Sequence, residues 1–324
     1  MAESTHSFQA PVLHPTPTST SAAHRAESSW VGPALALTGA VGFSGKAIFA
    51  KIAYAAAPID AVTLLALRMI FSLPFFGAMI WWSHRATTQA PLTRRDWTAI
   101  LWLGFFGYFL ASFLDFWGLE YISAGLERLI LFTNPTIVVV LSALVFGRKI
   151  TRRTAAALAL TYAGIVLVFA HDLVLASDTA TLLAGGGLVF ASAISYAIYL
   201  VGNGEIIQRI GAFRFTAYGM SVSAVFALGQ FFLTRPLSVL HAPATVYWMT
   251  FGMAVFSTVL PIWLTNEGIR RIGAGRVAMI GTSGPIMTIG LGAIFLGEAI
   301  TLFQLLGASL VIAGVIVVTF GKRT

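Results

Sequence analysis

The first half of this sequence places ionisable side chains inside stretches that are otherwise apolar. Lys46 follows Gly-Phe-Ser-Gly, Arg68 lies in Ala-Leu-Arg-Met, and Asp115 lies in Leu-Asp-Phe-Trp-Gly. Glu127 and Arg128 are adjacent, so on a helix they point about 100° apart. A charge inside a membrane is costly when it faces lipid, so these groups should face water, a ligand or one another. Lys46 then either forms an ion pair with Asp115 or Glu127 or contacts a substrate.

Uncharged polar side chains recur at helical spacing near these groups. Tyr108, Ser112 and Asp115 share one helix face, which predicts that this face lines an interior. Asn134 precedes Pro135, and a proline in a helix frees a backbone carbonyl one turn earlier. That carbonyl marks either a packing kink or a polar spot that a ligand or a side chain can use.

The second half carries a mixed aromatic and polar face at Ser192, Tyr196, Tyr199 and Asn203, with Asn266 on a later stretch. Phenol rings combined with hydroxyls suit an amphipathic organic substrate, whereas tyrosines at a membrane interface are the alternative. The predicted substrate pathway consists of Lys46, Arg68, Tyr108, Ser112, Asp115, Glu127, Arg128, Asn134, Ser192, Tyr196, Tyr199 and Asn266.

Enzymatic motifs are weak in this sequence. The segments 42–45 and 281–284 match the Gly-X-Ser-Gly of rhomboid-type intramembrane proteases, whose serine needs a histidine from a neighbouring helix. All six histidines fall in the N-terminal tail or in expected loops, so both segments are better explained as small residues at helix contacts. Cysteine is absent, and we predict no catalytic, cofactor or metal site.

The composition indicates a membrane protein. Hydrophobic residues make up 57% of the chain and charged residues 10%, with a mean hydropathy of +0.85. A soluble protein of 324 residues would need more polar surface. The net charge of +8 does not indicate nucleic-acid binding, because the basic residues lie in short segments between apolar stretches and report orientation.

Ten apolar stretches are each long enough to cross a bilayer about 30 Å thick. With both termini in the cytoplasm, fifteen of the 20 basic residues fall in inner segments and one, Arg235, in an outer loop. We expect residues 1–29 to be a disordered tail. The expected stretches are 31–54, 60–83, 97–119, 122–146, 153–170, 182–203, 213–234, 245–268, 275–297 and 301–320.

One segment occurs twice. Residues 123–169 match residues 273–319 after a shift of 150 positions, with Pro135 aligned on Pro285. Each half holds five stretches, an odd number, so the second half must enter the membrane upside down. The predicted fold is an all-α membrane protein of ten transmembrane helices arranged as two inverted five-helix repeats. The repeats are expected at 31–170 and 182–320.

Five motifs lie along most of the chain. They are GFSGKAIFAK at 42–51, ALRM with Arg68, RRDW at 94–97, FWGLEYISAGLERLILFTNPT at 116–136 and FLGEAIT at 295–301. The pattern resembles EamA-type members of the drug/metabolite transporter superfamily. The resemblance implies two inverted units that move small metabolites, often amino acids, across a bacterial inner membrane. Lys46 stands where such proteins carry a small or amide residue, and Arg148-Lys149 replaces a common Gly-Glu that Glu298 keeps in the second copy.

These observations predict a secondary transporter for small polar or amphipathic metabolites, with amino acids and related organic acids first among substrates. It would work by alternating access in the cell inner membrane, either as a facilitator or coupled to protons through Asp115 or Glu127. Its partners would be a small molecule, the lipid bilayer and, if coupled, protons, with no nucleic acid. The alternatives are a membrane enzyme or receptor on a ten-helix scaffold, and a nucleotide-sugar or lipid transporter. The sequence leaves the oligomeric state open.

Overall fold

A computed structural model of the chain describes residues 19–85, 91–147, 151–175, 178–272 and 274–320, and these residues form helices without any strand. Within this part, eight helices are long and apolar enough to cross a membrane, and Gly284–Leu296 and Leu302–Val317 are shorter apolar helices. The protein is therefore a multi-pass membrane protein. The elements are α1 (Ser19–Ala56), α2 (Ala61–Arg85), α3 (Arg94–Gly104), η1 (Phe105–Leu110), α4 (Ala111–Leu119), α5 (Ala124–Leu131), α6 (Asn134–Phe146), α7 (Arg152–Leu175), α8 (Thr179–Gly202), α9 (Gly204–Ile210), α10 (Ala212–Thr234), η2 (Leu237–Leu240), α11 (Ala244–Ala254), η3 (Val255–Val259), α12 (Leu260–Ile272), α13 (Ala274–Gly281), α14 (Gly284–Leu296) and α15 (Leu302–Phe320).

Polar residues and glycines fix several helix ends. Thr93 and Asp96 form a reciprocal capping box at the start of α3, and the Ser123 hydroxyl accepts the Leu126 N–H at the start of α5. Gly147 and Gly297 end α6 and α14 at φ 64° and 67°, a left-handed conformation that favours glycine. The two glycines, 150 residues apart, thus stop their helices for the same physical reason.

Two membrane crossings contain a π-helical turn. η1 joins α3 to α4 and η3 joins α11 to α12, so each crossing is continuous but locally wider than an α-helix. Two other crossings are broken. α5 ends before α6, which begins with Asn134 and Pro135, and α13 ends before α14, which begins with Gly284 and Pro285.

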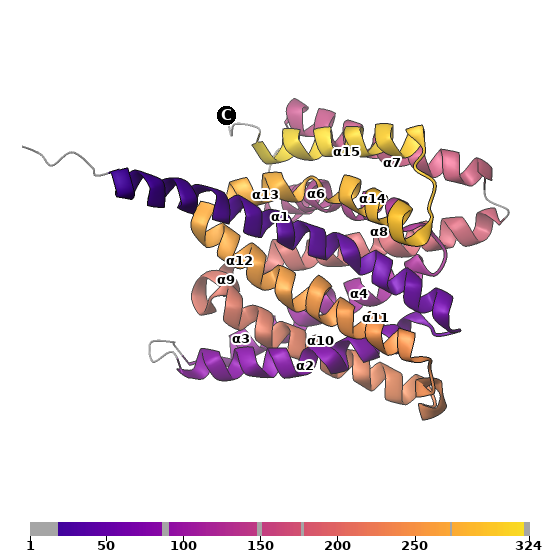
Figure 1. Cartoon of the computed structure of the whole chain (residues 1–324), viewed down its shortest axis with the longest axis horizontal. Helices are drawn as coiled ribbons and strands as arrows, with labels where there is room; N and C mark the ends of the chain where they lie inside the picture. The colour runs from indigo at the N-terminus through magenta and orange to yellow at the C-terminus, as the bar shows by residue number, and fades with distance from the viewer. Residues whose placement is uncertain (1–18, 86–90, 148–150, 176–177, 273, 321–324) are drawn as a thin grey trace, which may run out of the picture.

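The same element boundaries recur 150 residues apart. α5 and α13 begin at Ala124 and Ala274, and η1 and η3 begin at Phe105 and Val255. The packing follows the same correspondence, because α7 packs on α15 and α2 packs on α10, at opposite sides of the bundle (Figure 1). Likewise α1 packs on α12 as α8 packs on α4. Exchanging the two halves therefore leaves these helix contacts unchanged.

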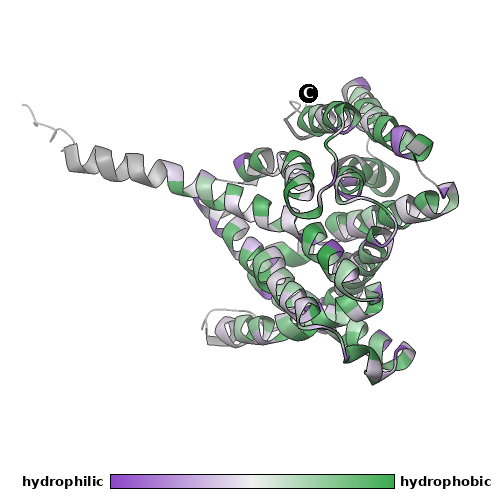
Figure 2. Cartoon of the chain, turned by 45° about the vertical axis from the view of Figure 1, so that its right-hand side comes forward, coloured by the Kyte–Doolittle hydropathy of each residue, from purple (hydrophilic) through white to green (hydrophobic). Residues whose placement is uncertain are grey.

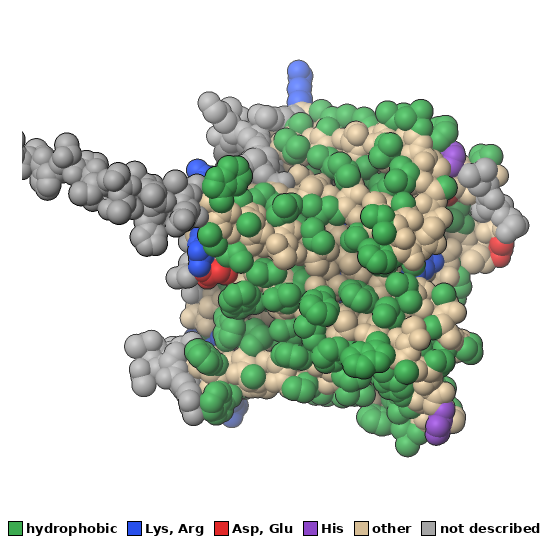
Figure 3. All heavy atoms as spheres, viewed as in Figure 1, with side chains coloured by type: hydrophobic (Ala, Val, Ile, Leu, Met, Phe, Trp, Pro, Cys, Tyr) green, Lys and Arg blue, Asp and Glu red, His purple; other side chains and the backbone are tan. Residues whose placement is uncertain are grey.

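The outside of the bundle is apolar. Hydrophobic residues extend along the helices, and hydrophilic ones concentrate near helix ends (Figure 2). Large apolar side chains cover the face seen in Figure 3, while coloured charged groups lie mainly at its edges. Val174 and Leu233 are 84% and 87% exposed, as expected of side chains that contact lipid.

The N-terminal boundary differs from the expected one. α1 begins at Ser19, so it extends into the segment expected to be a disordered tail. Alanine, glutamate and arginine favour a helix here, and no proline occurs between Ser19 and Pro33. Residues 1–18 lie outside the described part of the chain, and for them the expectation stands as a prediction.

Candidate functional site

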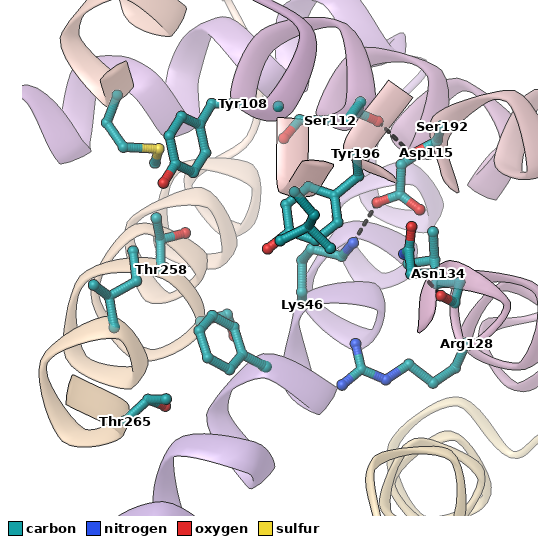
Figure 4. Close-up of a pocket in the computed structure, with 18 of the residues that line it drawn as sticks. Lys46, Tyr108, Ser112, Asp115, Arg128, Asn134, Ser192, Tyr196, Thr258 and Thr265 are labelled. Atoms are coloured by element: carbon teal, nitrogen blue, oxygen red, sulfur yellow. Dashed lines mark hydrogen bonds and ion pairs between the residues drawn. The ribbon is translucent and has the colours of Figure 1, made fainter. Parts of the chain in front are cut away.

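A cavity of about 570 Å³ lies between the two halves of the bundle (Figure 4). Its wall is built from α1, α2, η1, α4, α5 and α6 of the first half, and from α8, α10, η3 and α12 of the second. This volume is within the range of small-molecule sites. Nine of the twelve predicted pathway residues line it, namely Lys46, Arg68, Tyr108, Ser112, Asp115, Arg128, Asn134, Ser192 and Tyr196.

Lys46 forms an ion pair with two carboxylates. Its ammonium contacts Asp115 and lies 3.2 Å from Oε1 of Glu127. The Asp115 and Glu127 side chains are only 3% and 1% exposed. Both interpretations of Lys46 therefore have support, since it pairs with both acids and also borders the cavity. Glu127 lies behind Lys46 and does not itself line the cavity.

The two arginines of the cavity have no carboxylate in an ion pair within the described residues. The Arg68 guanidinium lies over the Phe116 ring, 4.9 Å from its centroid, and Arg128 lies 5.2 Å from the centroid of Phe132. In the part of the chain that the structure describes, Nε of each arginine is buried without a hydrogen-bond partner. Contact with an aromatic ring holds each guanidinium in place and leaves its donors free.

Phenols and hydroxyls form much of the remaining cavity lining. Tyr108 and Tyr199 are joined by a 2.8 Å hydrogen bond between their hydroxyls, and Tyr199 lies behind the lining while Tyr108 and Tyr196 border the cavity. The Ser192 hydroxyl donates to the Ala111 carbonyl at 2.7 Å. Ser192 therefore fixes α8 to α4 in addition to lining the cavity.

The backbone carbonyl that the proline frees in the first half is hydrogen-bonded to a side chain of the protein. Pro135 cannot donate to the Leu131 carbonyl, which instead accepts from Nδ2 of Asn134 at 2.8 Å. The break therefore creates a polar spot, and the side chain of Asn134 occupies it. Oδ1 of Asn134 is buried without a partner beside the cavity.

Equivalent positions of the two halves meet across the cavity. Lys46 and Tyr196 are separated by 150 residues, as are Asp115 and Thr265, and all four line the cavity. Tyr108 has the same relation to Thr258. The sequence prediction missed Thr258, Ser257 and Thr216. The 150-residue shift applied to Tyr108 would have found Thr258, whereas no predicted residue marks Ser257 or Thr216.

The remaining predicted residue, Asn266, lies on α12, but its side chain lies outside the described part of the chain. Ser44, the serine of the first Gly-X-Ser-Gly segment, donates to the Ala40 carbonyl at 2.9 Å and to the Gly284 carbonyl at 3.3 Å. It therefore joins α1 to α14. Within the described residues, no group of three His, Cys, Asp or Glu side chains is arranged to hold a metal ion.

The end of the bundle where α1 finishes is tied shut. Tyr54 donates to the Phe116 carbonyl at 2.9 Å, and Oε1 of Glu298 accepts the Ala124 N–H at 3.1 Å. An ion pair of Asp60 with Arg235 joins the two halves at this end. The cavity lining extends the other way, to Thr216 on α10 and Thr265 on α12.

At the closed end, the pKa values of Glu120 and Asp60 are shifted in opposite directions. Burial raises the pKa of Glu120, whose Oε1 accepts the Ala61 N–H at 2.6 Å. Burial alone would also raise the pKa of Asp60, but hydrogen bonds from Thr63 and the guanidinium of Arg235 outweigh it, so the pKa of Asp60 is lowered. Asp60 is therefore held in its charged form.

Comparison with known proteins identifies the class. The profile of the EamA-like transporter family matches residues 30–170 and, a second time, residues 183–320. The chain belongs to this family, which confirms the resemblance inferred from the motifs. A solved structure described as "Crystal structure of protein" has 16% sequence identity and a TM-score of 0.63, covers 90% of this chain and is itself covered to 97%, so it shares the fold.

Curated relatives are transporters by name. "Uncharacterized transporter YcbK" of Bacillus subtilis is 33% identical over 287 residues, which cover 85% of this chain and 88% of that protein. "Probable amino-acid metabolite efflux pump" of Salmonella typhimurium is 27% identical over 210 residues, or 62% of this chain and 69% of the relative. The protein of the same name from Escherichia coli is 26% identical over 208 residues, with 62% and 69% covered.

Proposed function

We propose that this protein is a secondary transporter that moves small polar or amphipathic metabolites across the inner membrane by alternating access. The observation that carries the proposal is the cavity of about 570 Å³, which is built from both halves and tied shut at one end. A site at the interface of two repeats that can rock against each other is the general design of such transporters. Amino acids and related organic acids remain the first candidates, and the names of two relatives agree with this.

The proposed architecture is ten transmembrane helices in two inverted five-helix repeats, 31–170 and 182–320. The family profile matches each half separately. The equivalent pairs α7 with α15 and α2 with α10 pack on each other, as expected if a two-fold axis passes between the members of each pair. Five crossings per half would make this axis lie in the membrane plane.

The proposed orientation has both termini in the cytoplasm, on the basis of the basic residues in the inner segments. The tied end of the bundle, with Asp60 and Arg235, is then the outer end. We infer an inward-facing state from this orientation, and opening outward would break the ties that Asp60 and Glu298 make between the halves. Transport is either facilitated or coupled to protons through Asp115 or Glu127.

Single-cysteine labelling tests this arrangement, because the native chain has no cysteine. Thr151→Cys and Ser238→Cys lie at opposite proposed ends and are exposed. An impermeant thiol reagent added to intact cells should label Ser238→Cys and not Thr151→Cys. The reverse labelling would overturn the orientation. Counterflow of radiolabelled amino acids and organic acids into proteoliposomes tests transport itself, and protein-independent uptake of every compound would count against it.

A further inference from the structure

We propose that the cavity selects organic monoanions, and that Arg128 is the residue that binds the anionic group, with Arg68 adding positive potential. This inference rests on the proposed transport function and names the substrate class for the same cavity. It differs from the simplest expectation for an amino-acid carrier, because the preferred substrate carries one net negative charge. It also assigns the anion-binding role to arginine instead of Lys46.

The first step is the charge balance around the cavity. Lys46 is already paired with Asp115 and Glu127, so its ammonium has two internal partners. Arg68 and Arg128 have aromatic contacts but no ion pair within the described residues. Three cations and two carboxylates leave an excess of one positive charge at the cavity, within the membrane-spanning helices. Excess charge is unfavourable there, and an entering monoanion removes it.

The second step is the place of Arg128. Its guanidinium projects from α5 into the open space of the cavity (Figure 4). A methyl group added at Gly284 would stand 2.9 Å from Nη2 of Arg128 and 3.0 Å from Cζ of Phe132. Gly284 therefore leaves room for the guanidinium, and the centroid of the Phe132 ring lies 5.2 Å from its Cζ. Among the described residues the planar group has no hydrogen-bond partner, so it can offer paired donors to a carboxylate.

The third step is the local backbone. α14 begins at Gly284, beside Arg128, and α6 begins at Asn134, which lines the cavity. The N-terminal end of a helix carries a partial positive charge, so both broken helices add to the attraction for an anion. The remaining lining includes Phe43, Tyr196 and Met220, which suit an apolar or aromatic body.

Four probes that share one body and differ in charge test the inference. They are 3-phenylpropionate, phenylalanine, phenethylamine and 3-phenylpropan-1-ol, which are anionic, zwitterionic, cationic and neutral at pH 7. Their affinities for the purified full-length protein are measured by calorimetric titration. We expect 3-phenylpropionate to bind at least about tenfold more tightly than each of the others, because a hydrogen-bonded charge pair is worth this much.

The variants separate the charge of Arg128 from its position. Arg128→Gln should remove the anion preference, and Arg128→Lys should restore it in part, because lysine keeps the charge but not the planar fork. Gly284→Ala displaces the guanidinium without changing any charge, so it should weaken 3-phenylpropionate most and leave phenethylamine and the alcohol, which lack a carboxylate, unchanged. Arg68→Gln should weaken the anion less than Arg128→Gln does. Arg94→Gln, which removes an exposed arginine at the start of α3, is the matched control and should bind like the native protein.

Equal or tighter binding of phenylalanine, phenethylamine or the alcohol overturns the inference, as does an anion preference that survives in Arg128→Gln. Absence of binding by all four probes also counts against it. Proteoliposome exchange separates this inference from the proposed function. If 3-phenylpropionate binds through Arg128 but is not exchanged, transport fails and the anion site stands. If phenylalanine is exchanged and 3-phenylpropionate is not bound, transport stands and the anion site fails.

Discussion

The two halves of the molecule share a backbone plan but differ in the chemistry that they bring to the cavity. Both contain a π-helical turn, a crossing broken before a proline and a glycine in the left-handed conformation. The charged groups of the cavity, Lys46, Arg68, Asp115 and Arg128, all come from the first half. The second half contributes phenols and hydroxyls, among them Tyr196.

The comparison separates the features that both copies of the fold need from those that one copy alone can supply. Helix breaks and close glycine contacts determine how the helices pack, so both halves need them. One charge cluster suffices for a shared cavity, and a second one would add desolvation cost without a second substrate. The ion pairs that join the halves use charges from both, since Asp60 and Asp96 of the first half pair with Arg235 and Arg209 of the second.

The largest expected effect comes from Lys46→Ala. It leaves Asp115 and Glu127 buried without their cation, and the loss of one partner of a buried pair costs about 3–5 kcal/mol. Thermal unfolding in detergent should show a strong drop in stability. The triple variant Lys46→Ala/Asp115→Asn/Glu127→Gln should recover most of it, because no unpaired charge remains.

Tyr196→Phe is the matched change at the equivalent position of the second half. It removes a hydroxyl instead of a buried charge, so the loss should stay below about 1 kcal/mol. If Tyr196→Phe destabilised the protein as much as Lys46→Ala does, the assignment of the charge chemistry to the first half would be wrong.

The second prediction concerns Gly164 and Gly314, which are equivalent positions on α7 and α15. A methyl group at Gly164 would stand 2.6 Å from the Gly307 carbonyl, and one at Gly314 would stand 2.7 Å from the Ala157 carbonyl. Gly164→Ala and Gly314→Ala should each cost about 1–3 kcal/mol through overpacking. Gly187→Ala, on α8 with nothing within 4 Å, should be neutral or slightly stabilising. A loss confined to one of the two variants would break the proposed symmetry.

The sequence predicted much of this plan because its determinants are local. Apolar length, Pro135 and the glycines of the turns act within a few residues of where they stand, so the stretches and the break were predictable. The π-helical turns were not, because their stabilisation is tertiary, as in the 2.8 Å hydrogen bond from Ser195 on α8 to the Phe106 carbonyl. The sequence named Asp115 and Glu127 as candidate partners of Lys46, but only the three-dimensional structure shows that Lys46 contacts both at once.

A third, smaller effect is expected at Gly147 and Gly297. Their φ values of 64° and 67° cost an alanine about 1 kcal/mol, and neither glycine has a neighbour within 4 Å of an added methyl group. Gly147→Ala and Gly297→Ala should therefore lower stability equally, through backbone conformation alone. Asparagine, which tolerates this conformation better, should cost less at both positions. Chemical denaturation of the four variants measures these differences, and unequal losses at the two positions would show that the turns are not equivalent.

The smallest effect should come from Asp60, which joins the halves at the closed end. Because the pKa of Asp60 is lowered on folding, its carboxylate stabilises the protein above its unfolded pKa of about 3.9, and this contribution is lost as the pH falls through the folded pKa. Asp60 and Arg235 are about one third exposed, so water and salt screen the pair, and Asp60→Asn should lose less than about 1 kcal/mol at pH 7.

At pH 3 the stability of Asp60→Asn should approach that of the native protein. Glu120 faces the same region and acts with the opposite sign, because burial raises the pKa of Glu120 and protonation then favours the folded state. The comparison should therefore be repeated in a Glu120→Gln background, which keeps an acceptor for the Ala61 N–H and removes the second titration. If Asp60→Asn remained equally destabilising from pH 7 to pH 3 in that background, the contribution of Asp60 would be packing or hydrogen bonding, and the ionic tie between the halves at this end would be refuted.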